Sequence, residues 1–324
     1  MRTTILGRSG LEVSRIAFGT WQLSGAWGSF DEDLAITAVR HARELGVNLF
    51  DTAQAYGAGR SEVLLGKALR AELKRDRDSV VLATKGGIKP RAERARDARR
   101  AWLTEGVEES LRNLGVDHID LYQVHWPDPD TPAEETAGVL QEFVDAGKIR
   151  HVGVSNYDSA QLAAFDEHRP AETLQPPYHL FRRGIEADPL PYARAHDVGV
   201  LVYSPLGSGL LTGAVGPDTR FEPSDWRSRS SAFQGENLRR NLEIVDKLSA
   251  FAGEKGISVS RLAIAWTLAR PGVHAAIVGA RKPANIEASL AAADIELSSD
   301  DLAEIDRITA DAVPIAGASP EGIA

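Results

Sequence analysis

The sequence of 324 residues contains no cysteine, which excludes disulfide bonds, thiolate metal sites and cysteine nucleophiles. It contains no apolar run near the roughly 18 residues of a membrane span, and residues 1–7 lack the apolar core of a signal peptide. Positive charge is not in excess, because 37 Lys and Arg stand against 46 Asp and Glu, for a net charge of -9. We therefore expect a cytoplasmic protein, a monomer or a weak homo-oligomer, that binds no nucleic acid, membrane or metal.

The composition is that of an ordinary globular protein, with 43% apolar and 26% charged residues. The length suits one large α/β domain or two small ones. No linker-like stretch divides the chain, so we predict a single domain over residues 1–324.

Strand-like and helix-like segments alternate along the chain. Eight short apolar runs have the character of buried strands, at Ile16–Gly19, Val47–Phe50, Val80–Ala83, Ile119–Val124, His151–Val154, Thr173–Leu174, Val200–Val202 and His274–Val278. Segments with helical periodicity lie between them, at Ala35–Leu45, Ser61–Leu73, Thr104–Leu114, Ala133–Ala146, Ser159–Glu167, Pro189–Ala195 and Asn237–Ala252. This alternation favours a parallel sheet with helical crossovers.

Eight strands in a chain of this length predict a closed (β/α)₈ TIM barrel. A doubly wound open sheet is the alternative, but the G-x-G-x-x-G turn that usually follows its first strand is absent after Ile16–Gly19. A short hairpin over residues 2–14 should precede the barrel, with its turn at residues 7–10. A carboxy-terminal helix over Ser299–Ile308 should follow it, with Ser298 or Ser299 as its cap.

Three of the predicted strands end in a titratable residue: Asp51, Lys85 and His125. Tyr56 follows Asp51 by five residues, just before a glycine. Because the carboxyl ends of barrel strands form the active site, we predict that these four side chains converge there. Taken singly, each has a simpler interpretation: a helix cap for Asp51, a surface charge for Lys85 and a buried core residue for His125.

Together the four residues can protonate an oxygen. An ammonium group lowers the pKa of a nearby phenol, so Lys85 would make Tyr56 a usable general acid, and Asp51 would keep Lys85 charged and in place. His125 would hydrogen-bond a substrate carbonyl oxygen and orient it. The natural partner of this step is hydride delivery from a nicotinamide.

The order and spacing of Asp51, Tyr56, Lys85 and His125 resemble the catalytic tetrad of the aldo-keto reductase family. Residues 50–57 resemble that family's first signature, and further matches occur, in order, at residues 19–21, 153–156, 175, 203–206 and 279–282. The resemblance extends from about residue 3 to residue 308. It implies a barrel that binds NADPH and reduces aldehydes or ketones.

The resemblance also implies a cofactor site. Its residues would be Gly19, Thr20, Trp21, Asp51, Ser155, Asn156, Gln175, Tyr203, Ser204, Leu206, Gly207, Ser208, Gly279, Arg281, Asn285 and Ser289. Within this set the nicotinamide carboxamide would be held at residues 155, 156 and 175, and its ring would stack on residue 203. The backbone of residues 204–208 would hold the pyrophosphate, and residue 281 the 2′-phosphate. Asn285 and Ser289 depart from the family's usual Gln or Arg and Asn, which leaves the preference for NADPH over NADH open.

Tryptophans are the candidates for the substrate pocket. Trp21 and Trp126 flank motif residues, and Trp27 and Trp226 lie in loops that would reach the same mouth. Such walls suit an apolar or aromatic carbonyl compound, although Trp27 and Trp226 would equally well pack their own loops. The long irregular stretch over residues 205–234 is a candidate lid.

Two other function classes compete with a carbonyl reductase. A cofactor-sensing binding subunit with little turnover would keep the same residues. A lyase that uses Lys85 as a Schiff-base nucleophile would need a neutral amine, whereas Asp51 would keep Lys85 protonated. The arginines of residues 86–98 form either a solvated face or an attraction for an anionic substrate.

Overall fold

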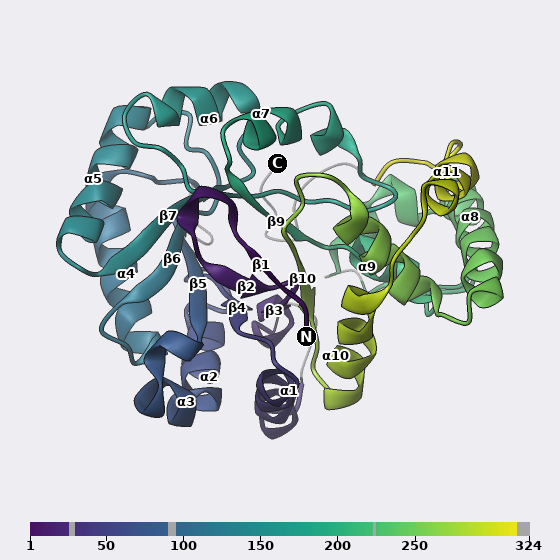
Figure 1. The fold of residues 1–324 in the computed structure, drawn as a ribbon, viewed down its shortest axis with the longest axis horizontal. Coiled ribbons are helices and arrows are strands. Elements are labelled where there is room, and N and C mark those ends of the chain that lie inside the picture. Colours follow the sequence, from purple (N-terminus) through teal and green to yellow (C-terminus); the bar gives the residue numbers. More distant parts are fainter. Residues whose placement is uncertain (26–29, 90–94, 223–224, 316–324) are drawn as a thin grey trace.

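The predicted (β/α)₈ barrel is confirmed by the computed structural model, which describes residues 1–25, 30–89, 95–222 and 225–315 (Figure 1). All eight barrel strands are parallel, and the sheet closes in the order β10-β3-β4-β5-β6-β7-β8-β9. The strands are β3 Ile16–Gly19, β4 Leu49–Asp51, β5 Val81–Gly86, β6 Ile119–Val124, β7 Ile149–Ser155, β8 Thr173–Gln175, β9 Gly199–Tyr203 and β10 Ala275–Gly279. Each of them overlaps one of the eight apolar runs.

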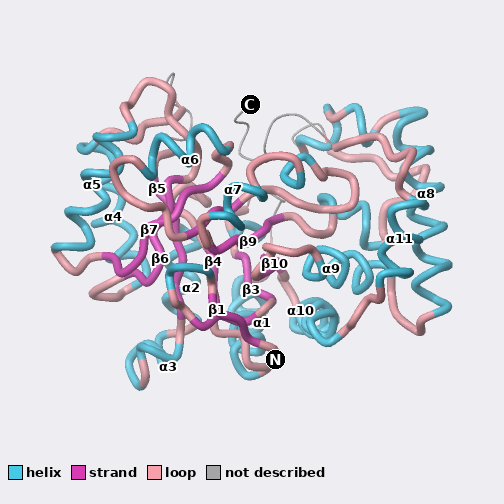
Figure 2. The backbone as a smooth tube through the Cα atoms, turned by 45° about the horizontal axis from the view of Figure 1, so that its top comes forward, coloured by secondary structure: helices cyan, strands magenta, loops and turns pink. Residues whose placement is uncertain are grey.

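The predicted hairpin is also present, formed by β1 Thr3–Ile5 and the antiparallel β2 Glu12–Ser14. It packs against the amino-terminal end of the barrel. In Figure 2 it lies below the barrel strands. Contact is close here, since a Cβ on Gly199 at the start of β9 would lie 2.6 Å from the Leu6 carbonyl oxygen. The hairpin closes the end of the barrel opposite to the predicted site.

Helices surround the barrel (Figure 1). They are α1 Glu32–Glu44, α2 Arg60–Ala68, α3 Arg70–Arg75, α4 Arg100–Leu114, α5 Ala133–Asp145, α6 Ser159–Asp166, α7 Leu190–Ala195, α8 Gly235–Glu254, α9 Val259–Ala269, α10 Pro283–Leu290 and α11 Ser299–Ile308. The caps behave as their chemistry predicts: Asp31 accepts a hydrogen bond from Leu34 N in α1, and Ser298 forms a capping box with Asp301 in α11. None of the described helices has the length and apolar character that a membrane crossing requires.

Two details differ from the prediction. The segment predicted as one helix over residues 61–73 is two helices, α2 and α3, because Leu69 leaves the helical conformation with ψ near 8°. Helices α9 and α10 were not predicted. Seven residues of α9 are buried, so this helix is apolar on most of its circumference and shows no helical period in the sequence.

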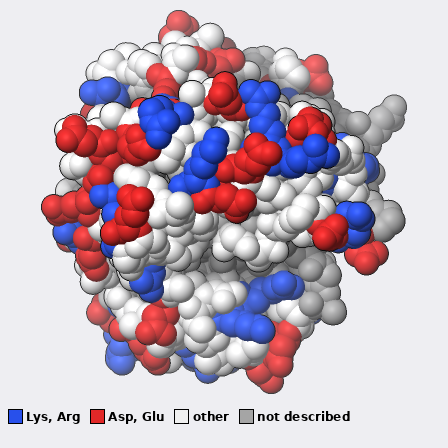
Figure 3. Space-filling model, turned by 90° about the vertical axis from the view of Figure 1, so that its right-hand side faces the viewer, with Lys and Arg blue, Asp and Glu red and all other residues white. Residues whose placement is uncertain are grey.

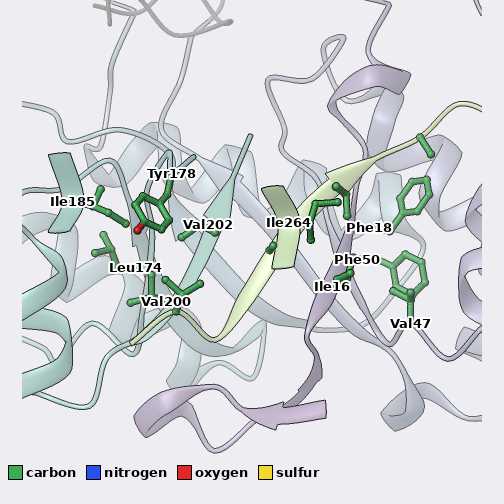
Figure 4. Close-up of a cluster of buried hydrophobic side chains, with 14 of the residues drawn as sticks. Ile16, Phe18, Val47, Phe50, Leu174, Tyr178, Ile185, Val200, Val202 and Ile264 are labelled. Atoms are coloured by element: carbon green, nitrogen blue, oxygen red, sulfur yellow. The ribbon is translucent and has the colours of Figure 1, made fainter. Parts of the chain in front are cut away.

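Strand alternation divides the core into two layers. Outward-facing side chains such as Phe18 and Phe50, whose ring centroids lie 6.2 Å apart, pack between the barrel and its helices (Figure 4). Inward-facing ones such as Leu49, Val81 and Leu121 fill the barrel. By the same alternation, a residue two or four positions after one of these inward-facing residues also faces the interior. Such residues lie at the carboxyl end of the barrel.

The surface that carries α8 and α11 mixes charges of both signs (Figure 3). Several of these charges form ion pairs, for example Lys255 with Asp301. Among the described residues, this face therefore presents no extended patch of a single sign.

Candidate active site

The structure brings Asp51, Tyr56, Lys85 and His125 together at the carboxyl end of the barrel. Lys85 Nζ donates to Asp51 Oδ1 at 2.6 Å and lies 3.4 Å from Tyr56 Oη. The Tyr56 and His125 rings meet edge to face with centroids 5.6 Å apart. The two strand-end residues point inward because Leu49 and Val81, which lie an even number of positions before them, also do.

The Asp51–Lys85 ion pair is buried, with Lys85 only 1% exposed. Its remaining polar atoms are satisfied: Lys85 Nζ also donates to Thr52 O at 2.8 Å, and Asp51 Oδ2 accepts from Gln175 Nε2 at 2.9 Å and Gln123 Nε2 at 3.4 Å. These extra hydrogen bonds offset the cost of removing two charges from water. Gln123 was missed from the sequence, although its position two residues before His125 on β6 places it inside the barrel.

His125 is held as a neutral imidazole. Burial, and then the positive charge of Lys85, hold its pKa well below the usual value. A neutral ring can hydrogen-bond a carbonyl oxygen at physiological pH without competing for the proton of Tyr56.

A cavity of about 300 Å³ extends from these residues along the barrel mouth to α10. Its lining includes most of the residues predicted for the site: Gly19, Thr20, Trp21, Asp51, Tyr56, His125, Ser155, Asn156, Gln175, Tyr203, Ser204, Leu206, Ser208, Gly279, Arg281 and Asn285. Five described candidates lie outside the lining, namely Lys85, Trp126, Gly207, Trp226 and Ser289. Trp27 lies outside the described residues.

One wall of the cavity is a hydrogen-bonded set of polar side chains. Asn156 Nδ2 donates to His125 O and to Ser155 Oγ, both at 3.0 Å, and Ser155 Oγ donates to Gln175 O at 2.8 Å. Tyr203 Oη donates to Asn156 Oδ1 at 2.8 Å. Asn156 adopts φ +63°, a conformation that asparagine tolerates better than most residues. These groups are therefore fixed in position around the cavity.

The backbone of the turn after β9 has a conformation that is suited to binding an anion. Gly207, Ser208 and Gly209 have consecutive φ values of +56°, +55° and +95°. Successive amides in left-handed conformations can point to one side and form a concave donor surface. Arg227 Nη1 donates to Ser208 O at 3.1 Å, and the His179 ring lies against Gly207, so the turn is supported from two sides.

Arg281, just before α10, and Asn285, in the first turn of that helix, also line the cavity. Ser289 Oγ instead donates to Asn285 O within that helix. Gln22 also lines the cavity and was missed from the sequence. Its carboxamide lies against β10, since a Cβ on Gly279 would be 1.7 Å from Gln22 Oε1. Only its position next to Trp21 could have indicated it.

The described tryptophan loops are packed by neighbours of their own. Trp226 meets Phe233 edge to face at 5.9 Å, within the segment of 3₁₀ turns that follows β9. The Arg96 guanidinium lies 5.2 Å from the Trp126 ring centroid. For Trp226 these contacts match the loop-packing interpretation, and Trp21 is the tryptophan that lines the cavity among the described residues.

Comparisons with known proteins agree with this architecture. A sequence model described as the Aldo/keto reductase family matches residues 15–310. Aldo-keto reductase YhdN of Bacillus subtilis (strain 168) is 43% identical over 311 residues, which cover 95% of this chain and 93% of that protein. The NADH-specific methylglyoxal reductase of Escherichia coli (strain K12) is 32% identical over 318 residues, covering 93% of this chain and 96% of that protein.

The solved structure of the glycerol dehydrogenase AKR11B4 from Gluconobacter oxydans matches with a TM-score of 0.86 and 40% sequence identity, over 94% of each chain. The chain therefore belongs to the aldo-keto reductase family, whose members are oxidoreductases that use nicotinamide cofactors and act on small carbonyl compounds.

Proposed function

We propose that this protein reduces aldehydes or ketones to alcohols with NADPH, with Tyr56 as the general acid. The observation that carries the proposal is the placement of the Tyr56 hydroxyl at the cavity wall, 3.4 Å from the ammonium group of Lys85, which is itself paired with Asp51. A cation beside a phenol favours its anionic form, so the proton is more readily given up. Tyr56 therefore donates its proton to the substrate oxygen, and His125 orients that oxygen.

The cavity has groups that suit a nicotinamide dinucleotide along its whole length. The side chains of Ser155, Asn156 and Gln175 offer donors and acceptors for a carboxamide, and the ring of Tyr203 offers an aromatic face. The turn beginning at Gly207 offers backbone donors for the pyrophosphate. When bound, the reduced nicotinamide supplies the hydride.

Arg281 is the reason to propose NADPH as the cofactor. A guanidinium group forms charge-assisted hydrogen bonds with a phosphate, and Arg281 lines the cavity. NADH is the competing cofactor, because Asn285 is shorter than the Gln, and less donating than the Arg, that are common in the family. A cytoplasmic location and a monomeric or weakly associating chain stay predictions from the sequence.

The test is the consumption of NADPH, followed by its near-ultraviolet absorbance, with a nitrobenzaldehyde and with the parent and Tyr56→Phe proteins. We expect turnover in the parent and a loss of about 10²–10⁴-fold in kcat for Tyr56→Phe, the contribution that a positioned general acid makes. Equal rates in both proteins would show that Tyr56 is not the proton donor. NADPH binding without turnover in the parent would favour a cofactor-sensing binding subunit.

A further inference from the structure

A stripe of polar residues runs along α4 where this helix packs on α2 and the barrel. The stripe consists of Glu109, Ser110 and Asn113: Asn113 lies four residues after Glu109 and three after Ser110, so these side chains share one face of the helix. Neighbouring apolar residues such as Val107 are buried in the core, as expected for this layer. Polar groups at such a depth are costly unless they are hydrogen-bonded, and the partners of this stripe come from the segment that carries Tyr56.

Glu62 is the centre of this cluster. It lies in the first turn of α2, and it is fully buried, with 0% of its surface exposed. Its Oε1 accepts from Thr84 Oγ1 at 2.7 Å, and its Oε2 accepts from Asn113 Nδ2 at 3.0 Å. The pKa of the Glu62 carboxyl is raised above its usual value, chiefly by burial and also by the neighbouring Glu109. The hydrogen bonds from Asn113, Thr84 and Ser110 lower the pKa and so offset part of this rise.

The two partners of Glu62 connect the site to its support. Thr84 directly precedes Lys85 on β5, and adjacent residues of a strand point to opposite faces. Lys85 therefore points into the barrel toward Asp51, while Thr84 points out toward Glu62. Holding Thr84 fixes the part of the strand that carries the ammonium group.

A second connection holds the other end of the Tyr56 turn. Gln54 N donates to Lys85 O at 3.0 Å, and Gln54 Nε2 donates to Glu109 Oε2 at 2.8 Å. The segment from Gln54 to Glu62 is thus fastened at both ends to the same helix, α4, and to the same strand, β5. Tyr56 lies between the two connections.

We propose that Glu62 is a positioning residue for the carbonyl reduction: its buried carboxyl joins Thr84 on the Lys85 strand to Asn113 behind the Tyr56 turn and so sets the distance between the Tyr56 hydroxyl and the Lys85 ammonium group. This role rests on the proposed function of the site. Glu62 would support the reaction without contacting the substrate or the cofactor.

The geometry leaves little tolerance. The Lys85 Nζ–Tyr56 Oη distance of 3.4 Å is already at the long end for a hydrogen bond. A displacement of the turn by 1 Å would break this contact, and misplacements of that size cost about 10²-fold in rate. Loss of the connection should therefore lower kcat while leaving the cofactor-binding residues of β7 to β10 in place.

The experiment compares three variants with a control. Glu62→Leu removes both hydrogen bonds at similar volume, Thr84→Val removes one partner, and Glu62→Gln keeps an acceptor for Thr84. Glu105→Leu, on the exposed side of α4, is the control. We expect kcat to fall by about 10-fold or more in Glu62→Leu and Thr84→Val, and to stay within about 3-fold of the parent in Glu62→Gln and in the control. NADPH affinity, measured by fluorescence, should change by less than about 3-fold in all of them.

The double variant separates positioning from general loss of stability. If Glu62 and Thr84 act through one connection, Glu62→Leu combined with Thr84→Val should lower kcat no further than either alone. A folded Glu62→Leu protein with the kcat of the parent would overturn the proposal. If Glu62→Leu does not fold, then equal kcat values in Thr84→Val and the parent would overturn it instead.

Failure of the proposed function would be recognised separately. A parent protein without carbonyl turnover would refute the reductase assignment but not the positioning role. In that case crystal structures of the parent and of Thr84→Val decide, because the role requires the Lys85 Nζ–Tyr56 Oη distance to lengthen beyond hydrogen-bonding range in the variant. An unchanged distance would refute the positioning role itself.

Discussion

Replacing Asp51 with asparagine removes one negative charge from the barrel mouth while keeping the shape of the side chain. Asp51 Oδ1 accepts the 2.6 Å hydrogen bond from Lys85, and Oδ2 accepts from Gln175 at 2.9 Å. In the variant, the ammonium group of Lys85 stays buried, with Thr52 O as an acceptor but with no carboxylate beside it. An uncompensated buried charge costs about 3–5 kcal/mol.

This cost is large enough to measure directly. At roughly 2 °C per kcal/mol for a chain somewhat longer than 250 residues, the midpoint of thermal unfolding should fall by about 6–10 °C. Urea unfolding at neutral pH gives the free energy, and Asp117→Asn, which changes an exposed carboxylate, is the matched control with an expected effect within about 0.5 kcal/mol. Turnover should fall by about 10²-fold, because the ammonium group is no longer held toward Tyr56.

A second substitution tests the reason for the loss. Lys85→Met in the Asp51→Asn background removes the stranded charge, so the double variant should regain most of the lost stability while remaining inactive. If Asp51→Asn unfolds at the same free energy as the parent, the ion pair does not compensate the burial of Lys85, and our account of the site is wrong.

Three further predictions concern other parts of the chain. Arg281→Ala should raise the KM for NADPH by about 10–100-fold, the value of a charged hydrogen bond, and leave the KM for NADH nearly unchanged; equal effects on both cofactors would remove the case for a 2′-phosphate contact. Burial, and then Arg182, lower the pKa of His179 in the folded protein to about 3. As the pH falls below about 6.5, His179 is therefore protonated in the unfolded chain but not in the folded one, and the free energy of unfolding decreases. His179→Asn should therefore reduce the slope of unfolding free energy against pH, between about pH 6 and 4, by up to about 1.4 kcal/mol per unit. Gly66→Ala should destabilise by about 1–3 kcal/mol, because its Cβ would lie 2.4 Å from a backbone oxygen of α4, whereas Gly138→Ala, with nothing within 4 Å in α5, should stabilise by up to about 1 kcal/mol in thermal unfolding.

The sequence was sufficient for the barrel because parallel strands are buried on both faces and read as short apolar runs. Of the two serines predicted as the cap of the carboxy-terminal helix, Ser298 is the one that caps α11. Helix α9 was not predicted because it is buried on most of its circumference, so that its apolar residues show no helical period. The break at Leu69 escaped because no Gly or Pro marks it.

The site was predictable to the extent that its residues end strands. Asp51, Lys85 and His125 were found from that rule alone. Gln22, Glu62 and the pairing of Gln123 with Asp51 were not, since these depend on contacts between segments that local sequence does not specify. Which loops reach over the mouth is likewise set by packing, as Trp226 on Phe233 illustrates.

The inner positions of the strands change character along their length. On β4 the inward-facing residues are Leu49 and then Asp51, and on β5 they pass from Val81 to Lys85. The amino-terminal half of the barrel is thus an apolar plug, completed by Leu6 from the hairpin, and the carboxyl-terminal half is a polar network. A network that holds a buried ion pair is costly on its own, and the apolar plug beneath it supplies burial energy that keeps the barrel closed around it. Stability and chemistry therefore depend on opposite ends of the same strands. Substitutions near Leu6 should alter the free energy of unfolding, whereas substitutions near Asp51 should alter both the free energy of unfolding and the activity.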